Sequence, residues 1–188
     1  MQRLKSQAEA NDIVLLFGDE SEALKHPNLA RAWAKSGADL RVPAPRQAKK
    51  VAMLGSLDDK TCELVVHPSK TKRSSDFVGH LEQLDRLYSP QPGRRATTAV
   101  LVLDNGPIHT RKLLRSAPPR PLAARRMGAQ IPPELDDIEA VWRDFEAHNL
   151  AHMTFDDVED LNREIHAAVQ TLNAQRMNLP LAESRIYA

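Results

Sequence analysis

Two continuous runs of apolar residues constrain the fold of this chain more than any other feature. Residues 13–17 (IVLLF) and 100–103 (VLVL) are short and show no alternation with polar residues. Such runs are typical of strands buried on both faces, in sheets that helices cover on both sides. An aspartate follows each run, Asp19 after Gly18 and Asp104 directly, where each strand is expected to end.

The segments between these two runs predict a mixed sheet of an α/β protein rather than a repeat array. Residues 51–55 and 62–67 are expected to form two strands joined by a turn at residues 57–60. A helix is then predicted up to Tyr88, because apolar residues recur at helical spacing, and Ser74 or Ser75 can cap its start.

The last third of the chain predicts two further helices. Ile138, Val141, Trp142 and Phe145 form one apolar stripe at the spacing of a helix face. A long amphipathic helix is expected over residues 158–172, with Thr154 and Asp157 resembling a capping box at its start. Residues 111–133 hold five prolines and little periodicity, so they are expected to form a loop with short helical pieces and no strand.

Composition excludes several classes of protein. The chain has 188 residues, which suits one domain with its own core. No stretch approaches the roughly 20 apolar residues that cross a membrane. The first residues lack the apolar core of a signal peptide, and Cys62 is the only cysteine, so no intrachain disulfide is possible. We therefore expect a cytoplasmic protein with no membrane partner.

Charge is distributed unevenly along the chain. Residues 41–126 hold 17 Lys and Arg against 7 Asp and Glu, whereas residues 134–164 hold 11 acids against 2 Arg. The basic block suggests a polyanionic partner. An alternative is that the two blocks pair with each other or with water.

Asp19 and Asp104 would lie side by side if their strands were parallel neighbours. Two adjacent carboxylates repel each other unless they share a proton or a cation, and Mg²⁺ prefers oxygen ligands. Glu139, beside the Ile138–Trp142 stripe, is a candidate third acid for a two-metal site. The alternatives are that both aspartates are turn residues and that Glu139 pairs with Arg143 four residues later.

Several motifs together resemble those of the DDE-superfamily transposases, in their mariner-like bacterial insertion-sequence branch. The resemblance covers nearly the whole chain, and 34 residues separate Asp104 from Glu139. The motifs are LLFGDES, GADLRVP, VLVLDNGPIHT, PPELDDIEAVWRDFEAHNLAHMTF and LNAQR. The resemblance implies a ribonuclease-H-like (retroviral-integrase-like) α/β fold with a mixed sheet and flanking helices.

The resemblance also implies an enzyme that cleaves DNA strands and transfers them into a target. Asp19, Asp104 and Glu139 would bind two Mg²⁺ or Mn²⁺ ions, with no other cofactor. Three residues beside these acids are expected in supporting or substrate-positioning roles, namely Glu20, Asn105 and His109. DNA contacts are expected from the basic block, including Lys49, Lys50, Lys70, Lys72 and Arg73.

The expected organisation is a catalytic domain over residues 1–175 and a C-terminal tail over residues 176–188. Such transposases normally carry an N-terminal helix-turn-helix region, and this sequence is expected to lack one. The partners implied are the element ends and target DNA, and a homodimer is compatible with the resemblance. The alternatives are a truncated, catalytically silent remnant that binds DNA or another transposase copy, and a host nuclease of the same fold.

Overall fold

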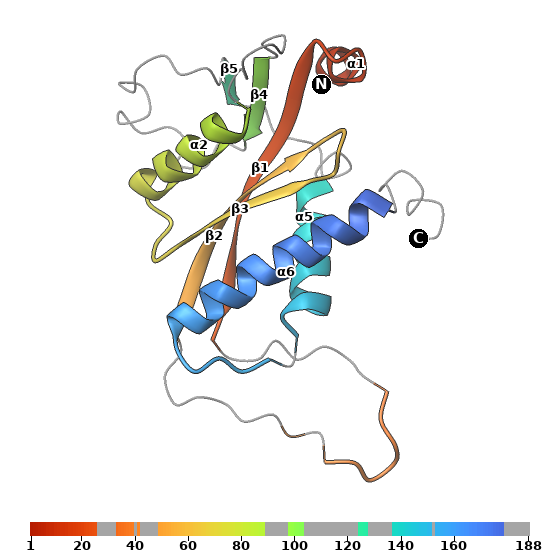
Figure 1. Cartoon of the computed structure of the whole chain (residues 1–188), viewed down its shortest axis with the longest axis vertical. Coiled ribbons are helices and arrows are strands. Elements are labelled where there is room, and N and C mark those ends of the chain that lie inside the picture. Colours follow the sequence, from red (N-terminus) through yellow and green to blue (C-terminus); the bar gives the residue numbers. More distant parts are fainter. Residues whose placement is uncertain are drawn as a thin grey trace.

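A computed structural model describes the chain over residues 1–25, 33–39, 41, 49–88, 98–103, 124–127, 137–151 and 153–178. Its centre is a five-stranded sheet in the order β3-β2-β1-β4-β5 (Figure 1). The strands are β1 (Ile13–Leu24), β2 (Lys50–Asp58), β3 (Leu64–Ser69), β4 (Thr98–Leu103) and β5 (Ala124–Met127). The helices are α1 (Gln2–Glu9), α2 (Ser74–Tyr88), α5 (Asp137–Asp144), the π-helical turn η2 (Phe145–Asn149) and α6 (Val158–Asn178).

The predicted mixed α/β sheet is confirmed, and β1 is its central strand. β1 pairs with β4 in parallel from Ile13↔Thr98 to Gly18↔Leu103. It pairs with β2 in antiparallel fashion from Leu16↔Asp58 to Leu24↔Lys50. The expectation that β1 ends at Asp19 is wrong, because β2 continues to supply hydrogen-bonding partners up to Leu24 after β4 has ended.

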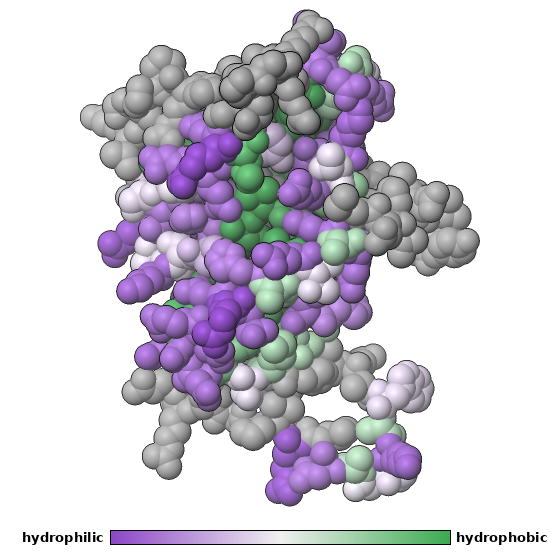
Figure 2. Space-filling model, viewed as in Figure 1, coloured by the Kyte–Doolittle hydropathy of each residue, from purple (hydrophilic) through white to green (hydrophobic). Residues whose placement is uncertain are grey.

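The two faces of the sheet bury separate cores. Leu15, Phe17 and Ala23 face one core, in which α5 and α6 pack. Leu16 faces the other core, in which α2 packs. Figure 1 shows α2 on one side of the sheet and α5 and α6 on the other. In Figure 2, which shows the molecule from the same side as Figure 1, apolar residues form a band along the middle, with hydrophilic residues on either side. The continuous apolar run of β1 thus reflects burial on both faces, as the sequence predicts.

Gly55 allows α5 to pack closely on β2. An added Cβ at Gly55 would lie 2.2 Å from the Cζ2 atom of Trp142, which is closer than any real contact. Trp142 is buried together with Ile138, Val141 and Phe145, so the predicted apolar stripe of this helix is confirmed. The indole ring therefore occupies the space that any other side chain at position 55 would need.

The hairpin of β2 and β3 is confirmed, with a turn later than predicted. Leu57 and Asp58 belong to β2, and the connection runs over residues 59–63. The carboxylate of Asp58 accepts hydrogen bonds from the backbone N–H groups of Lys60 (2.8 Å) and Thr61 (2.9 Å). Cys62 takes a positive φ of 58°. An aspartate side chain that satisfies the turn's own N–H groups explains why the chain reverses there.

Two predicted helix caps are wrong, and at both helix starts an aspartate side chain accepts a hydrogen bond from a backbone N–H group. At α6, Asp157 accepts a hydrogen bond from the N–H of Asp160 at 2.7 Å, in place of the predicted Thr154. At α2, the C=O of Arg73 accepts the first helical hydrogen bond, from the N–H of Phe77, so Arg73 and neither Ser74 nor Ser75 stands at the cap position. The N–H of Arg73 donates to the Asp76 carboxylate at 2.9 Å. A carboxylate at a helix start satisfies free N–H groups and is favoured by the helix dipole.

The expectation of no strand between residues 111 and 133 is also wrong. β5 pairs with β4 in parallel from Val100↔Ala124 to Leu103↔Met127. β5 is an edge strand, and backbone pairing to a single neighbour does not require the apolar run on which the sequence argument relied. The rest of that segment lies outside the described residues.

The opposite edge of the sheet, β3, has its outward backbone groups occupied by helix side chains. The Asn173 side chain of α6 bonds both the N–H and the C=O of Leu64, each at 2.9 Å. Gln83 of α2 donates to the C=O of Val66 at 3.3 Å. Pro68, the next residue with that orientation, has no N–H to offer. Two helices therefore cover β3 by specific hydrogen bonds.

Helix α6 crosses the predicted boundary at residue 175. It continues to Asn178, and the Arg176 side chain is only 10% exposed. Residues 179–188 of the expected tail lie outside the described residues.

None of the helices in the described part of the chain combines the length and apolar character needed to span a bilayer.

Substitution of Gly55 by alanine should test the packing of Trp142. We expect Gly55→Ala to lower the free energy of unfolding by about 1–3 kcal/mol, because the new methyl group overpacks the core. In a Trp142→Phe background the same change should cost less, since the smaller ring leaves room. Urea denaturation of the four proteins measures this coupling, and equal costs in both backgrounds would contradict the contact.

Substitution at the start of α6 should separate the observed cap from the predicted one. Asp157→Ala should lower the free energy of unfolding by about 1 kcal/mol, because it removes a capping carboxylate. Thr154→Ala, at an exposed position, should change it by less than about 0.5 kcal/mol. Chemical denaturation of both variants makes the comparison, and the reverse order of effects would restore Thr154 as the cap.

Candidate active site

Asp19 lies within β1, at the point where the neighbouring strand on one side ends. It pairs with Gly55 of β2, and it is the residue after Gly18, which forms the last pair with β4. Strand alternation places Asp19 on the same face as Phe17, towards α5 and α6. Its side chain is half-buried. The carboxylate is therefore held by a rigid central strand and stays partly open to solvent.

β4 ends at Leu103, one residue before Asp104 in the sequence, beside the residue that precedes Asp19. The last described residue of β4, Leu103, pairs with Gly18, so the pairing stops one residue before each aspartate in the sequence. Asp104, Asn105 and His109 themselves lie outside the described residues. The two strands are parallel neighbours, which is the condition on which the expected convergence depended, and the placement of the Asp104 side chain stays a prediction.

Glu139 lies in the first turn of α5 with its side chain exposed. It forms no ion pair with Arg143 among the described residues, so the alternative in which it is only a helix-surface pair gains no support. Glu20 lies on the opposite face of β1 from Asp19, by strand alternation. The structure therefore separates Glu20 from Asp19 and leaves Glu139 on the element that packs over the Asp19 face.

Three contacts fix the element that carries Glu139. Trp142, one turn after Glu139, packs on Gly55, which is the pairing partner of Asp19. Glu146 of η2 accepts a hydrogen bond of 2.6 Å from the hydroxyl of Ser21 on β1. The third contact is with α6, where Arg176 Nη2 lies 3.9 Å from Asp144 Oδ2. Burial lowers the pKa of Arg176, and the nearby Asp144 carboxylate opposes that effect.

Ser21, Glu146 and Gly55 were not among the site residues that the sequence suggested. Ser21 and Glu146 are 125 residues apart, and neither type of residue is unusual on a strand or a helix. The close approach of Trp142 explains Gly55, but an isolated glycine in a strand points to no particular partner. These contacts exist only because the fold places α5 over β1 and β2.

The donor set suits a hard divalent cation. Carboxylate oxygens are the preferred ligands of Mg²⁺, which is usually held by one or two carboxylates together with waters or phosphates. Among the described residues, no group of three or more His, Cys, Asp or Glu side chains is close enough to hold a metal ion. Two of the three predicted acids are described, so the donors present fit such an ion in kind, with Asp104 as the sequence candidate for the third.

The basic residues predicted to bind DNA gather near one end of the β2–β3 hairpin. Lys50 and Lys72 share one partner, Glu22, with N–O distances of 2.9 and 3.6 Å. The hydrogen bond from Lys50 is the main cause that lowers the pKa of Glu22. Lys70 follows the end of β3, Arg73 precedes α2, and Lys49 precedes β2. This end lies about 16 Å along β1 from Asp19, at roughly 3.3 Å per residue.

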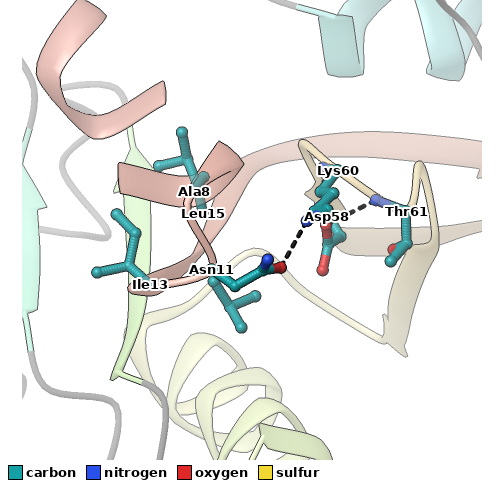
Figure 3. Close-up of a pocket in the computed structure, with 8 residues that line it drawn as sticks. Ala8, Asn11, Ile13, Leu15, Asp58, Lys60 and Thr61 are labelled. Atoms are coloured by element: carbon teal, nitrogen blue, oxygen red, sulfur yellow. Dashed lines mark hydrogen bonds between the residues drawn. The ribbon is translucent and has the colours of Figure 1, made fainter. Parts of the chain in front are cut away.

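The pocket in Figure 3 lies at the other end of β1 and away from the acids. It is lined by Ala8, Asn11, Ile13, Val14, Leu15, Asp58, Lys60 and Thr61. The Lys60 ammonium bonds Asn11, and the Asp58 carboxylate bonds the turn, so both charges are engaged within the chain. Its position between α1 and the β2–β3 turn indicates a structural junction.

One serine–histidine pair lies inside the core on the α2 face. Ser56 Oγ and His80 Nε2 are 2.7 Å apart, and both residues are at most 1% exposed. Burial lowers the pKa of His80 to about 3. A pair that no substrate can reach is a hydrogen bond between β2 and α2 and not a hydrolytic site.

Comparison with known proteins agrees with this geometry. The family model of the DDE superfamily endonucleases matches residues 14–162, which is more than half of the chain. None of the curated protein sequences compared with the chain matches it.

Solved structures share the fold at low sequence identity. A pre-cleavage Mos1 transpososome matches with a TM-score of 0.57 and 17% identity, over 97% of this chain and 59% of that one. The Mos1 mariner paired end complex with Mn gives 0.55 over the same shares. The HTLV-2 integrase catalytic core domain in complex with magnesium gives 0.50 and 13% identity, over 85% of each chain.

The chain thus spans 59% of the length of these Mos1 chains. Its described part has the ribonuclease-H-like fold of transposase and integrase catalytic cores, with acids on the central strand and on the helix above it. The family match and the fold agree, and the chain belongs to the DDE superfamily endonucleases.

Proposed function

We propose that this chain is the catalytic domain of a DNA transposase, which cuts phosphodiester bonds at the ends of a mobile element and joins the freed 3′ ends to target DNA. The observation that carries the proposal is the parallel pairing of β1 with β4, which ends one residue before Asp19 and Asp104. Neighbouring parallel strands present the residues at their shared end side by side, and this supports the proposal that the carboxylates of Asp19 and Asp104 act at one point of the sheet.

Asp19, Asp104 and Glu139 are the proposed ligands of two Mg²⁺ or Mn²⁺ ions. Bound divalent ions supply charge stabilisation at a phosphoryl group and lower the pKa of an attacking water. Solved neighbours of the same fold are complexes with Mn or with magnesium, which supports this choice of metal. Asp19 contributes a rigid carboxylate on the central strand, and Glu139 contributes one from a helix anchored on the same face.

Asn105 and His109, which follow Asp104 in the sequence, are proposed to position the substrate. Glu20 lies across the strand from Asp19, so we propose for it a supporting role through β1 without direct contact with DNA. The catalytic unit would comprise residues 1–175 with a tail after it, although α6 itself reaches Asn178. Two copies of the chain would act together, a proposal supported by the dimeric form of the HTLV-2 integrase core.

DNA would bind through the basic end of the β2–β3 hairpin. Lys49, Lys70 and Arg73 have no ion pair with another described residue, whereas Lys50 and Lys72 are held by Glu22. Phosphate contacts by Lys and Arg release counterions and make affinity depend steeply on salt. The basic end lies on the same sheet as Asp19, so a bound DNA strand that runs along the sheet can reach the acids.

Metal binding is the first test of this function. Mn²⁺ or Mg²⁺ should raise the melting temperature, since a ligand at 100 times its Kd stabilises the native state by about 2.7 kcal/mol. Asp104→Asn should remove most of this gain, because it deletes one charged ligand, and should abolish metal-dependent nicking of plasmid DNA. Differential scanning fluorimetry and gel electrophoresis of the nicked plasmid measure the two effects.

Glu159→Gln, an exposed acid in the first turn of α6, is the matched control and should keep both the metal response and the nicking. An unchanged metal response in Asp104→Asn would show that this aspartate is not a ligand. A metal response in the wild-type protein without nicking of any DNA would favour the alternative of a catalytically silent remnant that binds DNA or another transposase copy.

DNA binding is the second test. Lys70→Gln should weaken binding and reduce the slope of log affinity against log salt by about 0.9, as expected for one lost phosphate contact. Glu22→Gln should strengthen binding at low salt, because it removes the anion that holds Lys50 and Lys72. Fluorescence anisotropy with random-sequence duplex DNA over a salt series provides both numbers.

Lys60→Gln serves as the control, because Lys60 lies at the far end of the hairpin and bonds Asn11. It should leave the salt slope unchanged. Binding that is insensitive to salt, or an effect of Lys60→Gln equal to that of Lys70→Gln, would rule out the basic end as the DNA contact.

A further inference from the structure

The Ser21 hydroxyl and the Glu146 carboxylate join the two elements that carry Asp19 and Glu139. Their hydrogen bond is 2.6 Å long and partly buried. A hydroxyl that donates to a carboxylate makes a short and strong hydrogen bond, roughly twice as strong as one between neutral groups. The pair therefore connects β1 to η2 by a directional contact and not by apolar packing alone.

The two residues stand at fixed distances from the proposed acids along their own elements. Ser21 is two residues after Asp19, so it lies on the same face of β1, roughly 7 Å further along. Glu146 is seven residues after Glu139, about two helical turns, so it lies near the same side of the helix. The hydrogen bond thus sets the position of the helix along β1, two strand residues from Asp19 and about two helical turns from Glu139.

The π-helical turn at Phe145–Asn149 gives this contact its geometry. Phe145 is fully buried in the core, while the next residue, Glu146, reaches β1. π-Helical turns are rare, appear mostly as single turns within α-helices and are frequent at functional sites. Here the widened turn accompanies a contact that reaches from the helix to the strand.

The remaining contacts of the helix define its position along β1 only weakly. Trp142, Ile138 and Val141 pack by apolar contact, which is not directional. The Asp144–Arg176 pair is long, at 3.9 Å, and holds α6 rather than the sheet. Glu139 itself is exposed and has no ion pair with a described residue, so its placement depends on how the rest of the element is held.

We propose that the Ser21–Glu146 hydrogen bond is a positioning contact, which fixes α5 and η2 on β1 and thereby sets the placement of Glu139 relative to Asp19. This inference rests on the proposed function of those two acids. Ser21 and Glu146 do not touch the reacting atoms, and they act through the orientation of the helix. A mutation far from the reacting groups that displaces one of them by about 1 Å is enough to lower the rate on the order of 100-fold.

The experiment compares variants that break the hydrogen bond with variants that keep it. Ser21→Ala and Glu146→Ala break it, whereas Ser21→Thr keeps the hydroxyl and Glu146→Gln keeps an acceptor oxygen. We expect both alanine variants to raise the apparent Kd for Mn²⁺, followed by the shift in melting temperature, by about tenfold or more, as for other residues that orient metal ligands. The threonine and glutamine variants should stay close to the wild type.

Kinetics of DNA nicking give a second reading. The alanine variants should lose kcat on the order of tenfold or more with KM for DNA nearly unchanged, because the basic end that binds DNA is not altered. Ser75→Ala and Glu159→Gln, which change exposed residues of α2 and α6, are the matched controls and should match the wild type in both readings.

The outcomes separate this inference from the proposed function. Alanine variants with wild-type Kd and kcat would overturn the positioning role while leaving the function intact. A loss of thermal stability with equal effects on kcat and KM, and no rescue by Ser21→Thr, would also overturn it. Wild-type protein that binds Mn²⁺ but never nicks DNA would overturn the function, and the effect on Kd would still decide the positioning role. Absence of any Mn²⁺ response in the wild type would overturn both.

Discussion

The parallel pairing of β1 with β4 is the constraint on which the rest of this structure depends. It joins segments that are more than 80 residues apart in the chain and places both apolar runs in the middle of one sheet. Helices must then cover both faces, because the central strands are buried on either side. β1 continues beside β2 as far as Leu24 after its pairing with β4 has ended at Gly18, so Asp19 lies within a paired strand at the point where β4 ends.

The helix above Asp19 is held by contacts of different kinds. Packing of Trp142 on Gly55 supplies the buried apolar area, and a glycine at that position is what lets the indole approach the strand. The Ser21–Glu146 hydrogen bond adds direction. The Asp144 carboxylate links the same element to α6 through Arg176, and its Oδ1 atom lies 2.8 Å from Nδ1 of His148. Apolar packing alone would dock the helix, whereas the polar contacts determine how it is rotated and where along the strand it sits.

The sequence predicted the parts of the fold that rest on long apolar patterns. The buried strands at residues 13–17 and 100–103, the stripe around Trp142 and the long C-terminal helix all follow from burial, which leaves a periodic record in the sequence. The extension of β1 through polar residues did not, because it depends on the partner that β2 provides. β5 was missed for a similar reason, since an edge strand needs only backbone pairing.

The candidate site shows the same division. Asp19 and Glu139 were chosen as candidates from their places after an apolar run and beside an apolar stripe, together with the motifs around them, and their role as metal ligands stays a prediction. Ser21, Gly55 and Glu146 were not, because a contact across 125 residues leaves no local signal in a single sequence. The caps at α2 and α6 were missed because several Ser, Thr and Asp residues stand near each helix start, and only the backbone geometry selects among them.

The side chains that cover β3 have a consequence for how this domain meets other polypeptides. An exposed edge strand is a template for intermolecular sheet formation and for amyloid-like aggregation. Here Asn173 imitates a neighbouring strand at Leu64, Gln83 does so in part at Val66, and Pro68 interrupts the row of donors. An incoming strand would have to displace both helix side chains before it could form its own hydrogen bonds. Copies of the protein crowded together are thus hindered from joining through this edge.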